Sequence, residues 1–192
     1  MAKKEEATGE MTEIQNYEPL KEQMFMSDVF SSSGMFPDVK SKAQALVKIL
    51  AGKELGLSPF ESMASIYIVN GKLALTSKAM SSLIKKTEKY DYFVEKLDDM
   101  ECIISFVKLT DTKVELGKSS FTFKDAAKAG LANKDVWKNY PRNMLFSRAL
   151  SNGVRWYCPD AVCGYYTVEE VEDIPIEIKK TTIELTPEGE VK

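Results

Sequence analysis

The chain has 192 residues, 44% hydrophobic and 29% charged, which is typical of one soluble domain with a hydrophobic core. Its net charge of −3 conceals a segregation, because residues 1–39 and 161–192 each carry 3 lysines against 8 acidic residues, whereas residues 40–160 carry 20 basic residues against 13 acidic ones, a net of +7. Without histidine, P-loop or G-x-G-x-x-G motif, the chain excludes His-based catalysis and zinc sites and disfavours nucleotide-driven enzymes.

The N-terminal third predicts helices. Residues 1–16 are polar without hydrophobic periodicity, so we expect no regular structure there. A short helix is predicted over 18–30, and a clearer one over 42–55, where apolar residues recur at helical spacing. Ser58 and Glu61 then form a capping box that begins another helix.

The centre of the chain predicts strands. Two β-type runs, 66–69 and 72–76, flank Asn70-Gly71, whose residues tolerate positive φ, and this is a strong hairpin signal. A helix is predicted over 77–87. Three further strand-like runs predict an antiparallel meander: 90–97, 102–109 and 114–123.

The remainder alternates short helices with turns. Thr122 and Asp125 form a capping box, Pro141 begins a stronger helix with Gly153 near its end, and Thr167 caps a last short helix. Because no βαβ repeat occurs, the expected class is α+β, with a small antiparallel sheet of hairpin plus meander packed against several helices.

We expect a single α+β domain over residues 39–173 between two flexible acidic ends. Residues 1–38 would form an acidic, partly disordered arm with a short helix, and residues 174–192 an acidic tail. A basic globule between acidic ends suggests a polyanion partner. The alternative is an ordinary solvated surface with solubilising tails.

The helix predicted over 77–87 has two faces. Met80, Leu83 and Ile84 share one arc, which predicts the buried face. The opposite arc carries what we term the lysine stripe: Lys78, Ser82, Lys85 and Lys89. With Lys72 nearby in sequence, such a stripe could follow a phosphate backbone, or it could be a solvated helix face.

All three arginines, both tryptophans and two tyrosines lie within residues 137–157. These and one lysine are Trp137, Lys138, Tyr140, Arg142, Arg148, Arg155, Trp156 and Tyr157. Charge and exposed rings together suit single-stranded nucleic acid, because phosphates need charge and bases stack. Arg148 and Arg155 are expected opposite the buried face of their helix, the second only if the helix continues past Gly153. In the alternative, the tryptophans are core anchors and the arginines pair with local acids.

Two other patterns bear on the chemistry of the chain. Pro159-Asp160 followed by Glu177-Ile178-Lys179 fits the loose PD-(D/E)xK pattern of magnesium-dependent nucleases, but the second half lies in a Pro-flanked acidic segment rather than an evident strand. Cys102, Cys158 and Cys163 cannot form a disulfide framework and fit a reducing compartment. We expect Cys158 and Cys163 to be plain buried thiols.

Several segments keep a recognisable order and spacing. They are LVKILAGKELGLSP at 46–59, IYIVNGK at 66–72, Trp137 with YPRNML at 140–145, Arg148-Ala149, Arg155, and Pro159-Asp160 followed by GYYT at 164–167 and Glu169-Glu170. Together they resemble the RecT family of phage single-strand DNA annealing proteins, over about residues 45–170. No one segment is a catalytic signature.

The resemblance implies an ATP-independent recombinase that coats single-stranded DNA and promotes its annealing to a complementary strand. It implies a homo-oligomer, either a ring or a helical filament, with DNA in a basic groove between subunits. A phage exonuclease and a host single-strand-binding protein are the implied partners, in a bacterial cytoplasm. No cofactor is implied, and Mg²⁺ would serve only as a DNA counterion. Since 22 residues follow Glu170, too few for the C-terminal module of longer relatives, recruitment through that end is not expected.

The residues expected to line the DNA groove follow from these patterns. Those expected to contact phosphates are Lys72, Lys78, Lys85, Lys89, Lys138, Arg142, Arg148 and Arg155. Tyr140 and Trp156 are expected to stack on bases or to pack in the groove wall. Two other functions stay open: a magnesium-dependent nuclease using Asp160 and Glu177, and a non-enzymatic phage scaffold protein.

Overall fold

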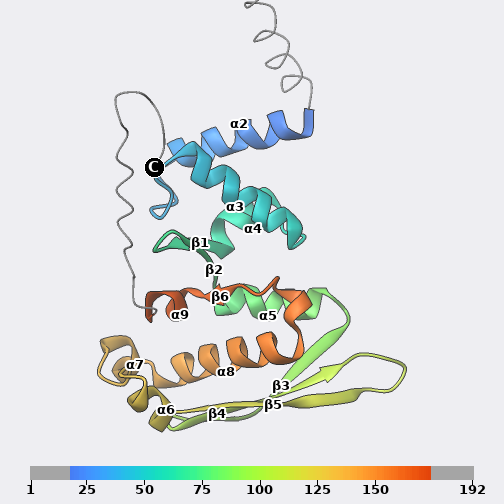
Figure 1. Ribbon diagram of the computed structural model, residues 1–192, viewed down its shortest axis with the longest axis vertical. Coiled ribbons are helices and arrows are strands. Elements are labelled where there is room, and N and C mark those ends of the chain that lie inside the picture. Colours follow the sequence, from blue (N-terminus) through green and yellow to red (C-terminus); the bar gives the residue numbers. More distant parts are fainter. Residues whose placement is uncertain (1–17, 174–192) are drawn as a thin grey trace, which may run out of the picture.

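The computed structural model describes residues 18–173, which form eight α-helices, one 3-10 helix and two three-stranded sheets (Figure 1). The expected α+β class is confirmed. The predictions for residues 1–16 and for the 174–192 tail, and the candidate metal ligand Glu177, lie outside the described residues.

Three helices form the N-terminal part of the fold: α2 (Glu18–Ser32), α3 (Lys42–Glu54) and α4 (Pro59–Ser65). Their common core consists of Ala45, Ile49 and Met63, packed against partly buried apolar side chains from α2 and from the loop that follows it. The predicted capping box of α4 forms in both directions, because Ser58 accepts from the Glu61 N–H while the Glu61 carboxylate accepts from the Ser58 N–H.

The predicted hairpin consists of β1 (Ile66–Val69) and β2 (Lys72–Leu75). Asn70 and Gly71 in its turn have φ of 52° and 74°, the left-handed pair that this tight turn requires. The other edge of β2 pairs in parallel with the short strand β6 (Tyr166–Thr167). Helix α5 (Ser77–Lys86) continues from the hairpin.

The meander forms a second sheet of β3 (Tyr90–Leu97), β4 (Glu101–Lys108) and β5 (Val114–Thr122). The sequence predicts one sheet made of hairpin and meander, but the two belong to separate sheets. The physical reason is that β6 occupies the free edge of β2, and α5 carries the chain away before β3 begins.

The remaining elements bring the two sheets together. They are α6 (Phe123–Lys128), α7 (Asp135–Asn139), α8 (Pro141–Tyr157), the 3-10 helix η1 (Pro159–Ala161) and α9 (Val168–Asp173). Helix α8 lies across the meander sheet, and α5, β6 and α9 lie on its other side (Figure 1). Because α8 is packed on two sides, more of its surface is buried than the single apolar stripe predicts.

Gly153 lies inside α8 and does not end it. A Cβ built there would lie 2.1 Å from Cε2 of Phe106 and 2.9 Å from Cβ of Ser119. Both of these residues belong to the meander sheet, so the missing side chain lets α8 approach the sheet closely. The glycine is a packing residue, and the helix continues to Tyr157.

We expect Gly153→Ala to lower the free energy of unfolding by about 1–3 kcal/mol, because the added methyl group overpacks the contact with Phe106. This loss opposes the higher helix propensity of alanine. Urea denaturation measures the difference. Phe106→Leu should relieve part of the clash, so the two substitutions together should cost less than the sum of their separate effects. Strict additivity would contradict this explanation.

Candidate nucleic-acid interface

The two faces of α5 agree with the sequence prediction. Met80, Leu83 and Ile84 are buried, whereas Lys78 and Lys85 are exposed on the opposite side. The Lys85 ammonium lies 2.8 Å from Oδ1 of Asp91. Its hydrogen bond to this carboxylate raises the pKa of Lys85. Lys78 is the member of the stripe whose charge faces solvent with no acidic partner among the described residues.

Lys89, the last member of the lysine stripe, lies beyond the end of the helix that carries the others. Helix α5 ends at Lys86, and the chain turns through Glu88 with φ of 55° before Lys89. The Lys89 ammonium lies 3.6 Å from the carboxylate of Asp160 on η1. Lys86, which the sequence patterns did not single out, is also exposed and donates to the Gly56 carbonyl. Lys86 therefore widens the cationic surface at the C-terminal end of α5 beyond the residues of the lysine stripe.

A second group of predicted residues lies where α7 meets α8. Lys138 is exposed, and the Tyr140 ring is 62% exposed. Arg142 donates through Nε to Asp99 at 2.8 Å, and both side chains are largely exposed, so this pair contributes little to stability. Trp137, in contrast, is buried against Phe121, with ring centroids 6.1 Å apart. Trp137 is thus a core anchor, while Tyr140 is available for stacking.

Trp156 is 60% exposed near the other end of α8. Sixteen residues separate it from Tyr140, so the two rings lie roughly 24 Å apart along the helix axis at a rise of about 1.5 Å per residue. The aromatic residues that cluster in the sequence therefore do not form one site in space. A strand that contacts both rings must follow the length of α8.

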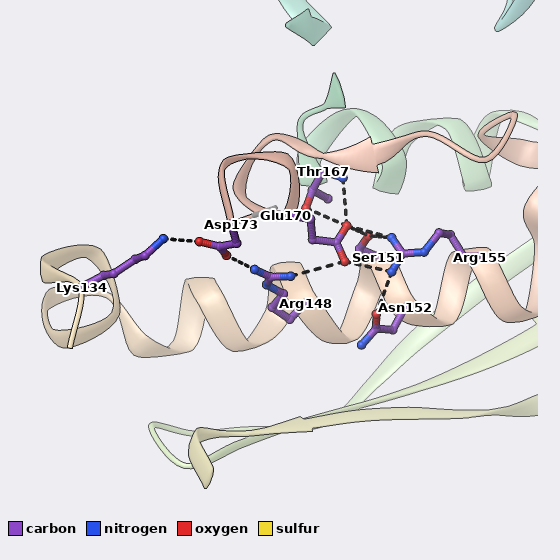
Figure 2. Close-up of polar contacts among 8 residues, drawn as sticks. All are labelled: Lys134, Arg148, Ser151, Asn152, Arg155, Thr167, Glu170 and Asp173. Carbon is purple, nitrogen blue, oxygen red and sulfur yellow. Dashed lines mark hydrogen bonds and ion pairs between the residues drawn. The ribbon is translucent and has the colours of Figure 1, made fainter. Parts of the chain in front are cut away.

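The two remaining arginines lie in an ion-pair network beneath α9 (Figure 2). Arg155 binds Glu170 in a bidentate manner, with Nη1 2.8 Å from Oε2 and Nη2 2.9 Å from Oε1. Nη2 also donates to Oδ1 of Asn152 at 2.8 Å, and the guanidinium lies over the Tyr166 ring, 4.7 Å from its centroid. Charge-assisted bidentate pairs of this kind are among the stronger hydrogen bonds in proteins.

Arg148 lies on the same side of α8, as its seven-residue spacing from Arg155 predicts. Its guanidinium pairs with Asp173 and lies 3.7 Å from Glu170, and Asp173 also accepts from Lys134 (Figure 2). The side chains of Arg148 and Arg155 are only 13% and 21% exposed. The expectation that this side of α8 faces solvent is therefore wrong. The segment β6–α9 covers it, which favours the alternative that both arginines pair with local acids.

Glu170 is the centre of this network. Burial would raise the pKa of its carboxyl, but hydrogen bonds from Arg155, Ser151 and the Thr167 N–H outweigh burial and hold the pKa below its ordinary value. The group is therefore a carboxylate at neutral pH, enclosed by donors. Its geometry is that of a structural clamp between α9 and α8.

The folded chain partly cancels the charge segregation of the sequence. Carboxylates from both acidic flanks pair with cations of the basic middle: Asp28 with Lys42 at 3.3 Å, Asp38 with Lys48 at 2.8 Å, and Glu170 and Asp173 with the arginines of α8. The exposed lysines that form no ion pair within residues 18–173 are Lys40, Lys53, Lys72, Lys78, Lys86, Lys108, Lys113, Lys124, Lys128 and Lys138. These are the side chains best placed to receive a polyanion.

The residues proposed for other chemistry have ordinary surroundings. Asp160 is exposed on η1, where it contacts Lys89 and accepts from the Tyr90 hydroxyl. Within residues 18–173, no group of three or more Cys, Asp or Glu side chains could hold a metal ion. Burial raises the pKa of the Cys158 thiol to about 12. Cys163 is exposed, so the expectation that it is buried is wrong.

Comparison with known proteins adds no relative. No family model matches the chain, and searches of curated proteins and of solved structures find no match either. No helix among residues 18–173 is both long enough and apolar enough to span a membrane.

Proposed function

We propose that this chain is an ATP-independent single-strand DNA annealing protein of the RecT type, acting as a homo-oligomer in a bacterial host and encoded by a phage or prophage. The observation that carries the proposal is the presence, on one molecule, of exposed lysines without an acidic partner among residues 18–173 and of two exposed rings, Tyr140 and Trp156. Among the cations assigned to DNA, these unpaired lysines are Lys72, Lys78, Lys86 and Lys138. This combination suits a flexible polyanion with accessible bases. The ordered sequence segments that resemble the RecT family support the same function.

The folded structure narrows the set of residues assigned to DNA. Arg148 and Arg155 hold α9 in place, so we assign them a structural role. The phosphate contacts fall to exposed cations: Lys72, Lys78, Lys85, Lys89, Lys138 and Arg142, with Lys86 as an addition. Tyr140 and Trp156 keep their role as stacking residues.

Annealing requires no covalent step. Cations along the strand lower the repulsion between phosphates, and each contact releases condensed counterions. Stacked but unpaired bases remain available while a second strand tests complementarity. Since neither contact reads base edges, sequence preference should be weak. The implied exonuclease would supply the single strand.

The test of function is fluorescence-quench annealing of two complementary oligonucleotides without ATP, followed by a denaturing gel for DNA length. Acceleration with full-length products is the expected result. Shortening of the DNA that occurs only with Mg²⁺ would favour the nuclease using Asp160 and Glu177. If the protein neither accelerates annealing nor shortens the DNA, this result contradicts a DNA function and leaves the scaffold alternative.

The DNA contacts can be tested one at a time. Trp156→Ala should cost about 1–3 kcal/mol of DNA-binding free energy through lost stacking. Titration of fluorescent single-stranded DNA measures this loss.

We expect Lys78→Ala to weaken binding of single-stranded DNA equally across sequences and to reduce the slope of log affinity against log salt by about one. Lys118→Ala is the matched control, because this exposed lysine of the meander sheet is not among the cations assigned to DNA. A loss on Lys78→Ala that depends on base sequence would argue against phosphate contact.

A further inference from the structure

A pocket with two aromatic rings in its lining lies over α8, between the meander sheet and α9. Its volume of about 290 Å³ is at the lower end of the range for small-ligand sites, roughly 300–1,000 Å³. The aromatic and apolar part of its lining consists of Phe121, Ala129, Leu131 and Tyr166. The charged part belongs to the ion-pair network described above: Arg148, Glu170 and Asp173. A ligand that enters the pocket therefore meets rings beside charges that are already paired.

Both rings are held in place by neighbouring side chains. Phe121 packs against the buried Trp137, with ring centroids 6.1 Å apart. Tyr166 is 46% exposed, and the Arg155 guanidinium lies over its ring, 4.7 Å from the centroid. Since the cation covers one face of the Tyr166 ring, the other face is left for stacking. Rings that are fixed in advance lose little conformational entropy when a flat ligand stacks on them.

The charges around the pocket suit a polyanion. Three cations of the network in Figure 2 face two carboxylates, a net charge of +1: Lys134, Arg148, Arg155, Glu170 and Asp173. Helix α6 adds two exposed lysines one turn apart, Lys124 and Lys128, the second of which adjoins the pocket residue Ala129. Neither forms an ion pair within residues 18–173. Phosphates can therefore lie along α6 while an uncharged group enters the pocket.

Trp156 lies on the same side of α8 as the pocket. Arg148 points toward α9, and Gly153 faces the meander sheet. At about 100° per residue, Trp156 lies about 80° past Arg148 and about 60° before Gly153 around the helix axis, which places its exposed ring between α9 and the sheet. The pocket spans the same gap, from Phe121 on β5 to Tyr166 on β6. A strand that follows α8 thus meets Trp156 and the pocket in turn, roughly 12 Å apart.

We propose that this pocket receives one unstacked base of single-stranded DNA, with the base against Tyr166 and Phe121 and the flanking phosphates at Lys124 and Lys128. The proposal rests on the proposed function and names a base-binding site within it. Stacking tolerates every base, and the polar groups of the pocket are already paired with one another, so no base is preferred. A base in a duplex must first be unpaired and unstacked, which costs free energy. The pocket therefore selects single strands over duplex DNA.

Filling the pocket tests this inference. Ala129→Trp places a large ring in the lining, whereas Ala127→Trp places the same ring on the exposed surface of α6, outside the lining, and is the matched control. Fluorescence anisotropy with a labelled oligothymidylate and with a duplex of equal length measures both affinities. We expect Ala129→Trp to weaken single-strand binding about five-fold or more, the loss of one stacked base, and to leave duplex binding unchanged. Ala127→Trp should change neither affinity.

Photo-crosslinking of the wild-type protein tests the same contact without a substitution. An oligothymidylate that carries 5-iodouracil in place of one thymine is expected to crosslink to Tyr166 or Phe121, and peptide mapping by mass spectrometry identifies the residue. If Ala129→Trp fails to fold by circular dichroism, Tyr166→Leu replaces it, because leucine keeps an apolar side chain at this position and removes the ring. The expected loss of single-strand affinity is the same.

Three results would overturn the proposal: an unchanged single-strand affinity in Ala129→Trp, equal losses for single strand and duplex, or crosslinks confined to residues outside the pocket. Annealing by the wild type is scored separately. If the wild type accelerates annealing, any of these results refutes the base pocket and keeps the proposed function. A wild type that binds no single-stranded DNA refutes the proposed function itself, and the base pocket with it.

Discussion

Replacing Glu170 with alanine is expected to lower the free energy of unfolding by about 3–5 kcal/mol, the cost of removing one partner from a buried ion pair. Arg155 would lose both arms of its bidentate contact, and Arg148 would lose its nearby carboxylate. The Thr167 N–H at the start of α9 would also lose its acceptor. Urea denaturation at neutral pH measures the loss.

The matched control for Glu170 is Glu172→Ala, which removes an exposed carboxylate from the same helix and should change stability by less than about 0.5 kcal/mol. The conservative Glu170→Gln variant keeps the shape of the side chain without its charge. If Glu170→Ala and Glu172→Ala had similar effects, the network in Figure 2 would not hold α9 in place.

The effect of Glu170 should depend on pH with a definite sign. Its pKa in the folded chain lies below the ordinary value of 4.5, so the unfolded chain binds the proton more tightly. The stability that the carboxylate contributes is therefore present above about pH 4.5 and is lost as the pH falls through the lowered pKa. The gap between wild type and Glu170→Gln should shrink below pH 4.5. A gap that is constant down to pH 3 would contradict the assignment.

Asp38→Ala is expected to be comparably damaging, at about 3–5 kcal/mol, because it leaves a buried ammonium without its counterion. Lys48 is fully buried, and its Nζ lies 2.8 Å from Oδ2 of Asp38, which also accepts from the Ile68 N–H. The Phe36 and Tyr67 rings lie within 5.6 Å of the same Nζ. Removing Asp38 thus leaves two donors unsatisfied beside aromatic rings.

The pH dependence of Asp38→Ala runs in the opposite direction to that of Glu170. Burial lowers the pKa of Lys48 below 10.5, against the raising effect of Asp38. Without Asp38 this pKa falls further, so the folded variant binds the proton less tightly than the unfolded chain. Its stability deficit should therefore shrink as the pH rises toward 10.5. Denaturation at pH 7 and pH 9.5 tests this sign.

Two further variants separate the buried charge from other effects. Lys48→Met in the Asp38→Ala background removes the unpaired ammonium and should recover part of the lost stability. Asp28→Ala breaks the Asp28–Lys42 pair, in which both side chains are about half exposed, and should cost no more than about 1 kcal/mol. Equal losses for the buried and the exposed pair would refute the importance of burial here.

The sequence alone predicts the elements whose causes are local. Asn70-Gly71 favours its hairpin through positive φ, Ser58 and Glu61 satisfy each other's backbone donors, and the 3.6-residue period places Met80 inside α5 and Lys78 outside it. Each of these causes lies within a few residues of its effect. The buried and exposed faces of the helix that carries the lysine stripe are predictable from the sequence for the same reason.

Other features depend on which distant segments meet. The spacing of Arg148 and Arg155 places them on one side of α8 but does not show that Glu170, 15 residues beyond Arg155, covers that side. Gly153 reads as a helix end until the Phe106 ring is seen against it. Periodicity reports that a face is polar or apolar, whereas packing determines whether the polar groups meet water or each other. For this reason the arginines beneath α9 serve the fold, whereas Lys78 and the Tyr140 and Trp156 rings stay exposed.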